Sequence, residues 1–130
     1  LRYRANRDSG ASNYDQAGAL AALTDPAVKQ ITSKIFATYG RRADILRNGL
    51  DKLGFQWSGL SNTPYAWFRT PAEDDAAAAA LVLEKAGVIL TPGSGFGPAG
   101  KGFLRATIFQ PEDRLQEAID RLVEIDFHQI

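Results

Sequence analysis

The chain lacks cysteine entirely and has one histidine, His128, among its 130 residues. Without cysteine it forms no disulfide and offers neither a thiolate nucleophile nor a thiolate metal ligand. A single histidine also excludes, within one chain, a metal cluster of several histidines and a histidine-based catalytic triad. We therefore expect no metal site.

An excess of charge of one sign is also missing, because 15 Lys and Arg balance 15 Asp and Glu. A chain without a broad electrostatic field is not drawn to nucleic acid or to an anionic membrane. No apolar run approaches the roughly 18 residues needed to span a bilayer, and no charged-then-apolar leader opens the chain. We expect a cytoplasmic protein with neither nucleic acid nor membrane as a partner.

Methionine is absent too, and the chain begins at Leu1. Residues 1–7 have the character of the end of a helix that started earlier. We expect the chain to be a piece of a longer polypeptide, with a processed or engineered terminus as the alternative.

What the chain does contain is the composition of an ordinary globular domain, 45% hydrophobic and 23% charged. Asp25 and Pro26 are typical of a helix start, and Gly54 of a helix end. Between them an apolar stripe recurs at steps of three and four residues. Its members are Val28, Ile31, Ile35, Tyr39, Leu46, Leu50 and Leu53. We therefore predict a long helix over residues 26–53.

The remaining elements follow from shorter patterns. Thr70, Pro71 and Glu73 predict a second major helix start with a capping box. Residues 88–90 are wholly apolar, which is typical of a strand covered on both faces. The other predicted elements are a helix over residues 16–23, strands over 55–57, 65–69 and 103–109, a helix over 71–86, and a last helix from residue 111.

This order predicts an α/β fold, an α+β two-layer sandwich with a small mixed sheet. The helices are expected to pack on one face of the sheet, with the long helix at the N-terminal side. We expect one domain over residues 1–130, in which residues 1–24 are connecting helices and residues 25–130 form the sandwich.

Arg105 is a charged residue among apolar ones in the predicted strand 103–109. Alternation puts it on the face opposite the core-facing residues Leu104, Ala106 and Ile108. Arginine is rarely buried without a partner, and its planar fork suits a carboxylate held by two parallel hydrogen bonds. Arg105 is therefore a candidate anchor for an anionic ligand. The alternative is a structural ion pair with an Asp or Glu of the nearby helices.

Gly95, Gly97 and Gly100 match the pattern G-x-G-x-x-G just before that strand. A dinucleotide site of this type needs a helix directly after the glycines to hold the pyrophosphate, whereas here a strand follows. We therefore reject a dinucleotide site. The glycines serve either tight turns alone or a close approach of the backbone to a ligand or partner.

Residues 88–100 read V-I-L-T-P-G-S-G-F-G-P-A-G, and residues 103–105 read F-L-R. This stretch resembles the C-terminal segment of pyridoxal-phosphate-dependent class I/II aminotransferases of fold type I, closest to the LL-diaminopimelate and aspartate aminotransferase-like branch. Residues 8–17 with D-S-G, residues 39–44 with Y-G-R-R-A-D and residues 64–68 with P-Y-A-W-F resemble the same family in the same order. The resemblance implies the C-terminal small domain of such an enzyme.

The resemblance also implies roles for individual residues. Arg105 matches the arginine that binds the α-carboxylate of the amino-acid substrate. Gly95 and Phe96 would lie beside the substrate as loop residues, and Ser9 and Gly10 would approach an active site. The parent enzyme would be a homodimer that uses pyridoxal phosphate to convert an amino acid to a 2-oxo acid, and the missing large domain would be a further partner.

In this family the Schiff-base lysine, the aspartate at the pyridinium nitrogen and the phosphate-binding groups precede the matched region. None of the lysines of this chain lies in a Ser-x-x-Lys context of the family kind; they are Lys29, Lys34, Lys52, Lys85 and Lys101. We expect no catalytic and no cofactor-binding residue here, no pyridoxal phosphate bound to the fragment, and no activity of the fragment alone.

Two other functions stay open at this point. A stand-alone ligand-binding or regulatory α/β module would use Arg105 to hold a carboxylate without chemistry. A structural dimerisation piece would use Trp57, Trp67 and Phe96 as interface anchors. The reading frame upstream of Leu1 separates the enzyme from the stand-alone module.

Overall fold

The computed structural model describes residues 10–61, 63–72 and 74–127. These residues form two compact units, of which the first ends at Ala37 and the second begins at Thr38. The predicted helix end over residues 1–7, Ser9 and Glu73 all lie outside the described residues. No helix within the described part of the chain has the length and apolar character needed to cross a membrane.

The first unit contains α2 (Asn13–Thr24) and the beginning of α3 (Pro26–Lys52). The predicted start of α3 is confirmed, because the carboxylate of Asp25 accepts the backbone N–H of Ala27 at 2.8 Å. No residue of α2 is buried. The burial of the predicted apolar stripe also differs between the two ends of α3.

On the first-unit side of α3, the stripe residues Ile31 and Ile35 are 57% and 45% exposed. On the second-unit side, Leu46 and Leu50 are buried. The periodicity therefore predicted the helix correctly, but only the second part of the stripe enters a core within the described residues.

The second unit contains a four-stranded sheet in the order β1-β2-β4-β3. Its elements are β1 (Trp57–Gly59), β2 (Tyr65–Arg69), α4 (Asp75–Ala86), β3 (Thr91–Pro92), β4 (Phe103–Thr107) and α5 (Glu112–Val123). The α/β class is confirmed. The sheet is not mixed as predicted, since every neighbouring pair of described strands is antiparallel. The short connection between β3 and β4 makes them a hairpin, which requires antiparallel pairing.

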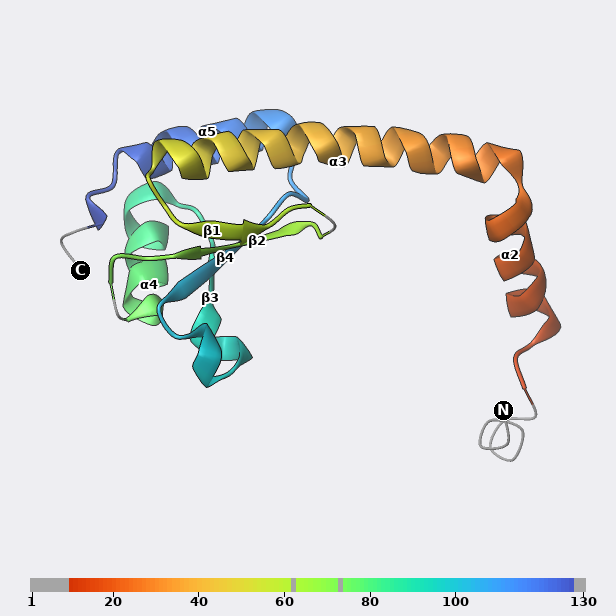
Figure 1. Ribbon diagram of the computed structural model, residues 1–130, viewed down its shortest axis with the longest axis horizontal. Helices are drawn as coiled ribbons and strands as arrows, with labels where there is room; N and C mark the ends of the chain where they lie inside the picture. Colours follow the sequence, from red (N-terminus) through yellow and green to blue (C-terminus); the bar gives the residue numbers. More distant parts are fainter. Residues whose placement is uncertain (1–9, 62, 73, 128–130) are drawn as a thin grey trace. The chain divides into compact units, whose positions relative to one another are not determined.

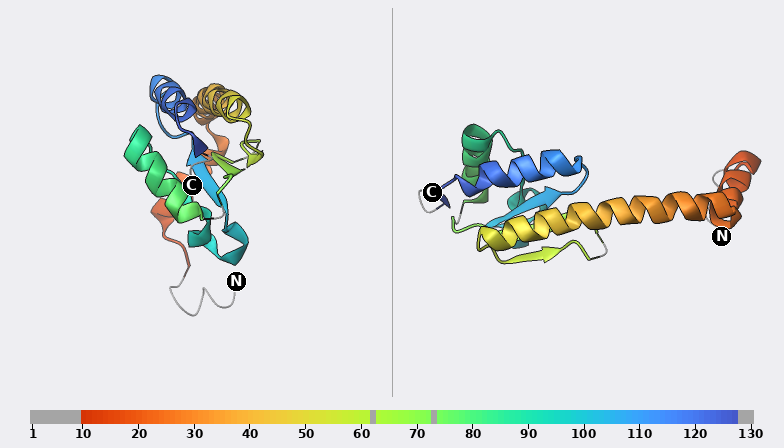
Figure 2. Two further views of the ribbon diagram at one scale, coloured as in Figure 1. Left: turned by 90° about the vertical axis from the view of Figure 1, so that its left-hand side faces the viewer. Right: turned by 90° about the horizontal axis from the view of Figure 1, so that it is seen from above.

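The helices of the second unit cover one face of this sheet. The second part of α3 runs beside α5, and α4 lies next to them on the same side (Figures 1 and 2). On that side Phe68 and Leu104 are 1% and 0% exposed, and Ala106 and Ile108 are also buried, as alternation predicted. The opposite face carries the half-exposed residues of β2 and β4.

Gly49 allows α3 and α5 to approach closely. A Cβ added at this position would lie 2.3–2.8 Å from three side-chain atoms of Ile119. Ile119 itself is 3% exposed. The cost of glycine inside a helix, about 1 kcal/mol relative to alanine, is therefore offset by packing that a larger residue would prevent.

Two local predictions are wrong. Residues 88–90 are not a strand, and Ile89 is 82% exposed, so this segment is not covered on both faces. The second major helix begins at Asp75 with Asp74 as its N-cap, not after Thr70. The hydroxyl of Thr70 donates instead to the carbonyl oxygen of Ala72 at 2.7 Å. This bond shapes the turn before the helix, a use of threonine that competes with capping.

Candidate functional site

Arg105 lies on the uncovered face of the sheet, in a strand that has neighbours on both sides. In the register it stands opposite Trp67 of β2 and Thr91 of β3. The adjacent residues Leu104 and Ala106 point to the helices and are buried, whereas Arg105 is half-buried. The strand therefore holds the base of this side chain rigidly and presents its guanidinium on the open face.

Two aromatic rings contact the guanidinium. Its central carbon lies over both rings, 4.4 Å from the ring centroid of Tyr65 and 4.5 Å from that of Phe96. Phe96 also meets Trp67 edge-on, with ring centroids 5.2 Å apart. Rings attract a cation over their faces. The N–H bonds of a guanidinium lie in its plane, so such contacts leave them directed toward an anion at the edge.

Within the described residues, Arg105 makes no hydrogen bond and no ion pair, although other arginines do. Arg41 pairs with Glu112 at 2.9 Å, and Arg47 pairs with Asp44 at 2.7 Å. The structural alternative, in which a helix carboxylate satisfies Arg105, is therefore not what the described part of the chain shows. The guanidinium retains its capacity to bind a carboxylate.

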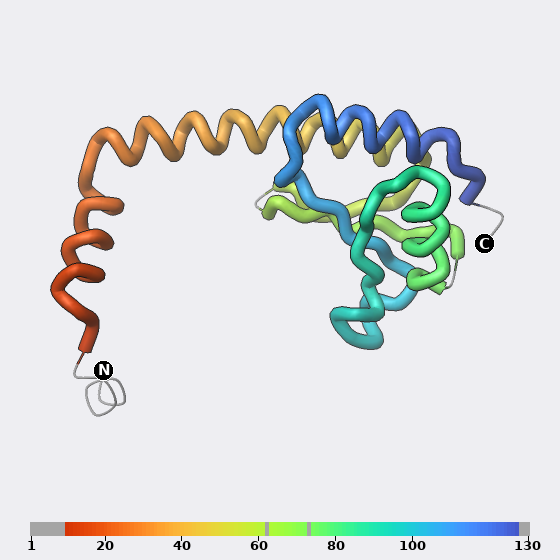
Figure 3. The backbone as a smooth tube through the Cα atoms, turned by 180° about the vertical axis from the view of Figure 1, so that it is seen from behind, coloured from red at the N-terminus to blue at the C-terminus, as the bar shows by residue number. Residues whose placement is uncertain are grey.

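The glycine loop, residues 93–102, connects β3 to β4 and carries Phe96. It lies on the side of the second unit away from α3 and α5 (Figures 1 and 3). Its backbone crosses itself closely: a Cβ on Gly93 would lie 2.1 Å from the carbonyl oxygen of Gly100, and the reciprocal distance is 2.0 Å. Side chains at these two positions are excluded, so the glycines serve the loop's own geometry.

Asp75, the first residue of α4, ties the two ends of the glycine loop together. Its carboxylate accepts the backbone N–H of Ser94 at 2.8 Å and that of Gly102 at 3.3 Å. The residue is 2% exposed. A buried carboxylate is costly unless it is hydrogen-bonded, and here the loop supplies the donors.

The pKa of Asp75 is lowered from its ordinary value of 3.8 to about 2. The backbone N–H of Ser94 is the largest cause, followed by the Ser94 hydroxyl, while burial acts in the opposite direction. Hydrogen bonds to the charged form favour ionisation. Asp75 is therefore a carboxylate at neutral pH.

No pattern in the sequence distinguishes Tyr65 or Asp75 as a site residue. Acidic residues are common in the first turn of any helix, so nothing in the pattern distinguished Asp75 from its neighbour Asp74. Tyr65 was only one residue of the predicted strand 65–69, with no role of its own. Their roles depend on the pairing of β2 with β4 and on the fold of the loop over α4, which local patterns do not give.

The structure brings one of the other predicted site residues to Arg105. Phe96 contacts it and is 53% exposed, and the adjacent Gly95 is exposed in the same loop. Gly10 lies in the first unit, exposed, with φ of +99°. Ser9 lies outside the described residues. The assignments of Ser9, Gly10 and Gly95 stay predictions.

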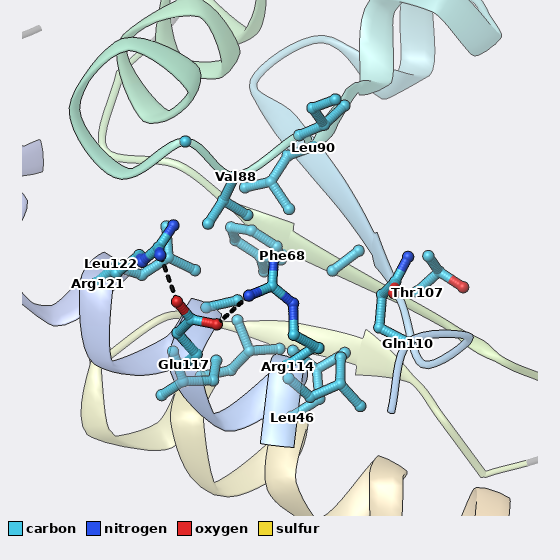
Figure 4. Close-up of a pocket in the computed structure, with 17 residues that line it drawn as sticks. Leu46, Phe68, Val88, Leu90, Thr107, Gln110, Arg114, Glu117, Arg121 and Leu122 are labelled. Carbon is cyan, nitrogen blue, oxygen red and sulfur yellow. Dashed lines mark hydrogen bonds and ion pairs between the residues drawn. The ribbon is translucent and has the colours of Figure 1, made fainter. Parts of the chain in front are cut away.

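A hollow of about 390 Å³ lies on the helix-covered side, beside α5 and the segment before β3. Its walls are mainly apolar and include Phe68 and Leu90, while Glu117 pairs with Arg114 and Arg121 at its edge (Figure 4). The charges there already satisfy one another. No group of His, Asp and Glu side chains that suits a metal ion occurs among the described residues. Arg105 therefore remains the best-supported candidate for ligand binding.

The residues of this chain do not by themselves fit pyridoxal phosphate. A Schiff base requires a lysine beside the site, but Lys29, Lys34, Lys52, Lys85 and Lys101 are all exposed, and Lys85 pairs with Glu84 at 3.6 Å. No reaction step is therefore assigned to a lysine of this chain.

Comparison with known proteins agrees with the architecture. The sequence pattern of the family described as aminotransferase class I and II matches residues 4–122. The LL-diaminopimelate aminotransferase of Moorella thermoacetica is 39% identical over 122 residues, which cover 93% of this chain and 31% of that protein. The probable chloroplastic LL-diaminopimelate aminotransferase of Oryza sativa subsp. japonica is 38% identical over 117 residues, 90% of this chain and 25% of that protein.

Solved structures share the fold. The L,L-diaminopimelate aminotransferase of Chlamydomonas reinhardtii superimposes with a TM-score of 0.78 at 37% identity, covering 88% of this chain and 28% of that one. A mutant of the Thermus thermophilus aspartate aminotransferase gives a TM-score of 0.77 at 29% identity, covering 93% and 32%. The chain thus spans about a quarter to a third of the length of the relatives it matches.

Proposed function

Because the chain belongs to the aminotransferase class I and II family, we propose that it is the part of an amino-acid aminotransferase that binds the substrate α-carboxylate. Arg105 is the residue that performs this task. The whole enzyme converts an amino acid to a 2-oxo acid. The observation that carries the proposal is the guanidinium of Arg105, presented by a strand that has neighbours on both sides, in contact with two rings and without an internal anion among the described residues.

The contribution of Arg105 is orientation. Two parallel N–H···O bonds from a guanidinium fix both oxygens of a carboxylate and so fix the rotation of the amino acid about its α-carbon. A substrate held in one orientation presents its α-C–H bond to the reacting group without a further loss of entropy. The contacts with Tyr65 and Phe96 restrict the guanidinium before the substrate arrives.

Pyridoxal phosphate supplies the electron sink for such a reaction when it is bound. We propose that residues outside this chain hold it, in the large domain, and that the whole enzyme is a homodimer. We propose further that residues 1–24 connect to that domain and that residues 25–130 form the small domain. The relatives named for LL-diaminopimelate make that amino acid the first substrate to test.

The test is substitution of Arg105 in the full-length protein that carries this chain. Arg105→Ala leaves the substrate carboxylate unpaired, at a cost of about 2–5 kcal/mol, so kcat/KM falls about 30-fold to several thousand-fold. Arg105→Lys restores the charge without the planar fork and gives an intermediate loss. Steady-state rates with LL-2,6-diaminopimelate and a panel of L-amino acids, with 2-oxoglutarate as amino acceptor, measure both effects.

Arg69→Ala is the matched control. Arg69 is exposed on the neighbouring strand, and its guanidinium lies over the ring of Phe103 at 5.7 Å. The Arg69→Ala substitution removes the same charge from the same sheet and is expected to change kcat/KM less than about twofold. If Arg105→Ala retains kcat/KM near the wild-type value for every amino acid tested, the proposed function is wrong.

A further inference from the structure

Asp75 is a buried charged group to which the proposed function gives no role. It is the one acidic residue that is buried among the described residues. Its two acceptor bonds reach Ser94 and Gly102, which stand at opposite ends of the glycine loop. A single carboxylate on α4 thus holds both ends of a segment whose own side chains supply little packing.

The loop held in this way carries one residue into the candidate site. Phe96 contacts the guanidinium of Arg105 on one strand and meets Trp67 on the next. Phe96 is 53% exposed, so it has few other contacts to fix its place. The position of its ring therefore depends on the backbone of the glycine loop.

The crossing of Gly93 and Gly100 sets the shape of the loop but does not attach it to the rest of the second unit. Attachment comes from the strands on either side, from the backbone N–H of Thr70, which donates to the carbonyl oxygen of Gly102 at 3.1 Å, and from the two bonds to Asp75. Both bonds are charge-assisted, and such bonds are roughly twice as strong as neutral ones. Asp75 is thus the side chain that connects the loop to α4.

We propose that Asp75 is a positioning residue for substrate binding, which fixes Phe96 over the guanidinium of Arg105 by anchoring the glycine loop to α4. The inference rests on the proposed role of Arg105. Asp75 itself does not contact the substrate. It acts on the affinity for the carboxylate through the loop and the ring.

Asp75→Asn tests the inference in the full-length protein. An asparagine amide has one acceptor oxygen, and its NH₂ group faces an N–H donor, so one of the two bonds between α4 and the loop is lost. We expect KM for the amino acid to rise on the order of tenfold while kcat stays within about threefold, because the oriented guanidinium binds the carboxylate equally in the substrate complex and in the transition state.

Asp74→Asn is the matched control. Asp74 is the neighbouring residue, is exposed, and accepts the backbone N–H groups of Ala76 and Ala77 as the N-cap of α4. Asparagine is an equally good N-cap, so the same change of charge one residue away is expected to leave KM unchanged. A rise in KM common to both variants would mean that charge near α4, and not the anchored loop, is responsible.

A double variant separates positioning from general stability. If Asp75 acts through Phe96, KM of Asp75→Asn/Phe96→Leu is no higher than that of the more affected single variant. Independent effects would multiply instead, and that result would overturn the inference. If the substitutions merely destabilised the fold, this non-additive effect on KM would not be expected.

If Asp75→Asn fails to fold, Ser94→Ala tests the same link from the loop. Ser94 is exposed, and its hydroxyl also stabilises the carboxylate of Asp75. We expect KM to rise about twofold to threefold on its removal. An unchanged KM in both variants, with a large loss in Arg105→Ala, overturns the inference and leaves the proposed function standing. An unchanged kcat/KM in Arg105→Ala removes the proposed function itself.

Discussion

The two faces of the small sheet differ in what their side chains meet. On β4, Leu104 is fully buried beneath the helices, whereas the next residue, Arg105, is half-buried on the open face. On β2, the same division separates Phe68 from Trp67. The covered face is satisfied by contacts within the second unit. The open face presents a guanidinium, stacked on rings, whose hydrogen-bonding groups have no partner among the described residues. Alternation along a strand thus gives one face to the core and leaves the other face open for the proposed binding of a carboxylate.

The largest expected difference between the faces is in the free energy of unfolding. Leu104→Ala removes fully buried methyl groups and leaves a cavity, which costs about 2–5 kcal/mol. Arg105→Met keeps an apolar stem beside the rings and loses two partly exposed cation–π contacts, at about 1–2 kcal/mol in total. Urea unfolding of the three proteins measures both changes. If the two substitutions lower the free energy of unfolding equally, the open face contributes to the core as the covered face does, and the two faces do not differ in this way.

A smaller loss in the free energy of unfolding is expected where α3 and α5 meet above the covered face. Gly49→Ala puts a Cβ against Ile119, whose β-branched side chain has little freedom within a helix. Overpacking of about 1–3 kcal/mol exceeds the gain of up to about 1 kcal/mol in helix propensity, so the variant is destabilised. The measurement is the same urea titration.

Gly40→Ala is the control for that substitution, in the same helix. A Cβ at Gly40 meets nothing within 4 Å, so only the gain in helix propensity of up to about 1 kcal/mol remains and the variant is stabilised. Stabilisation by Gly49→Ala as well would show that α3 and α5 are packed less tightly than the structure has them.

The smallest expected effect is the loss of stability at low pH that comes from Asp75, which anchors the glycine loop beside the open face. The pKa of Asp75 is lowered to about 2 in the folded chain, below the value near 3.9 of an unfolded aspartate. The stability that its ionisation contributes is therefore complete above about pH 4 and is lost as the pH falls through about 2. We expect the difference in stability between the wild type and Asp75→Asn to shrink over this interval. The protection of the Ser94 and Gly102 amides against hydrogen exchange, relative to their intrinsic exchange rates at each pH, should fall in the wild type over the same range. A difference that stays constant with pH would contradict the lowered pKa.

The sequence predicted those elements whose signals are local. The long helix from Pro26 has a cap, a proline start and a three-to-four-residue period, and it forms as expected. The strand with Arg105 has an alternating pattern, and its two faces were assigned correctly. The prediction of a strand over residues 88–90 was wrong because an apolar run of three residues carries no period, and here Ile89 points to solvent.

The site was predictable to a lesser degree. Arg105 stood out because charge is rare in an apolar strand, and Phe96 entered through the family resemblance. Asp75 and Tyr65 gave no such signal, because their partners are remote in the sequence. Asp75 meets residues 19 and 27 positions away.

The sequence alone determined the long helix from Pro26, the strand that carries Arg105 and the face of that strand that turns away from the core, because caps, periods and alternation act over a few residues. Only the tertiary structure decided that the sheet is antiparallel, that two rings contact the guanidinium and that one buried carboxylate anchors the glycine loop. Those features depend on which distant segments meet. A hydrogen bond or a ring contact then fixes positions that no local pattern encodes.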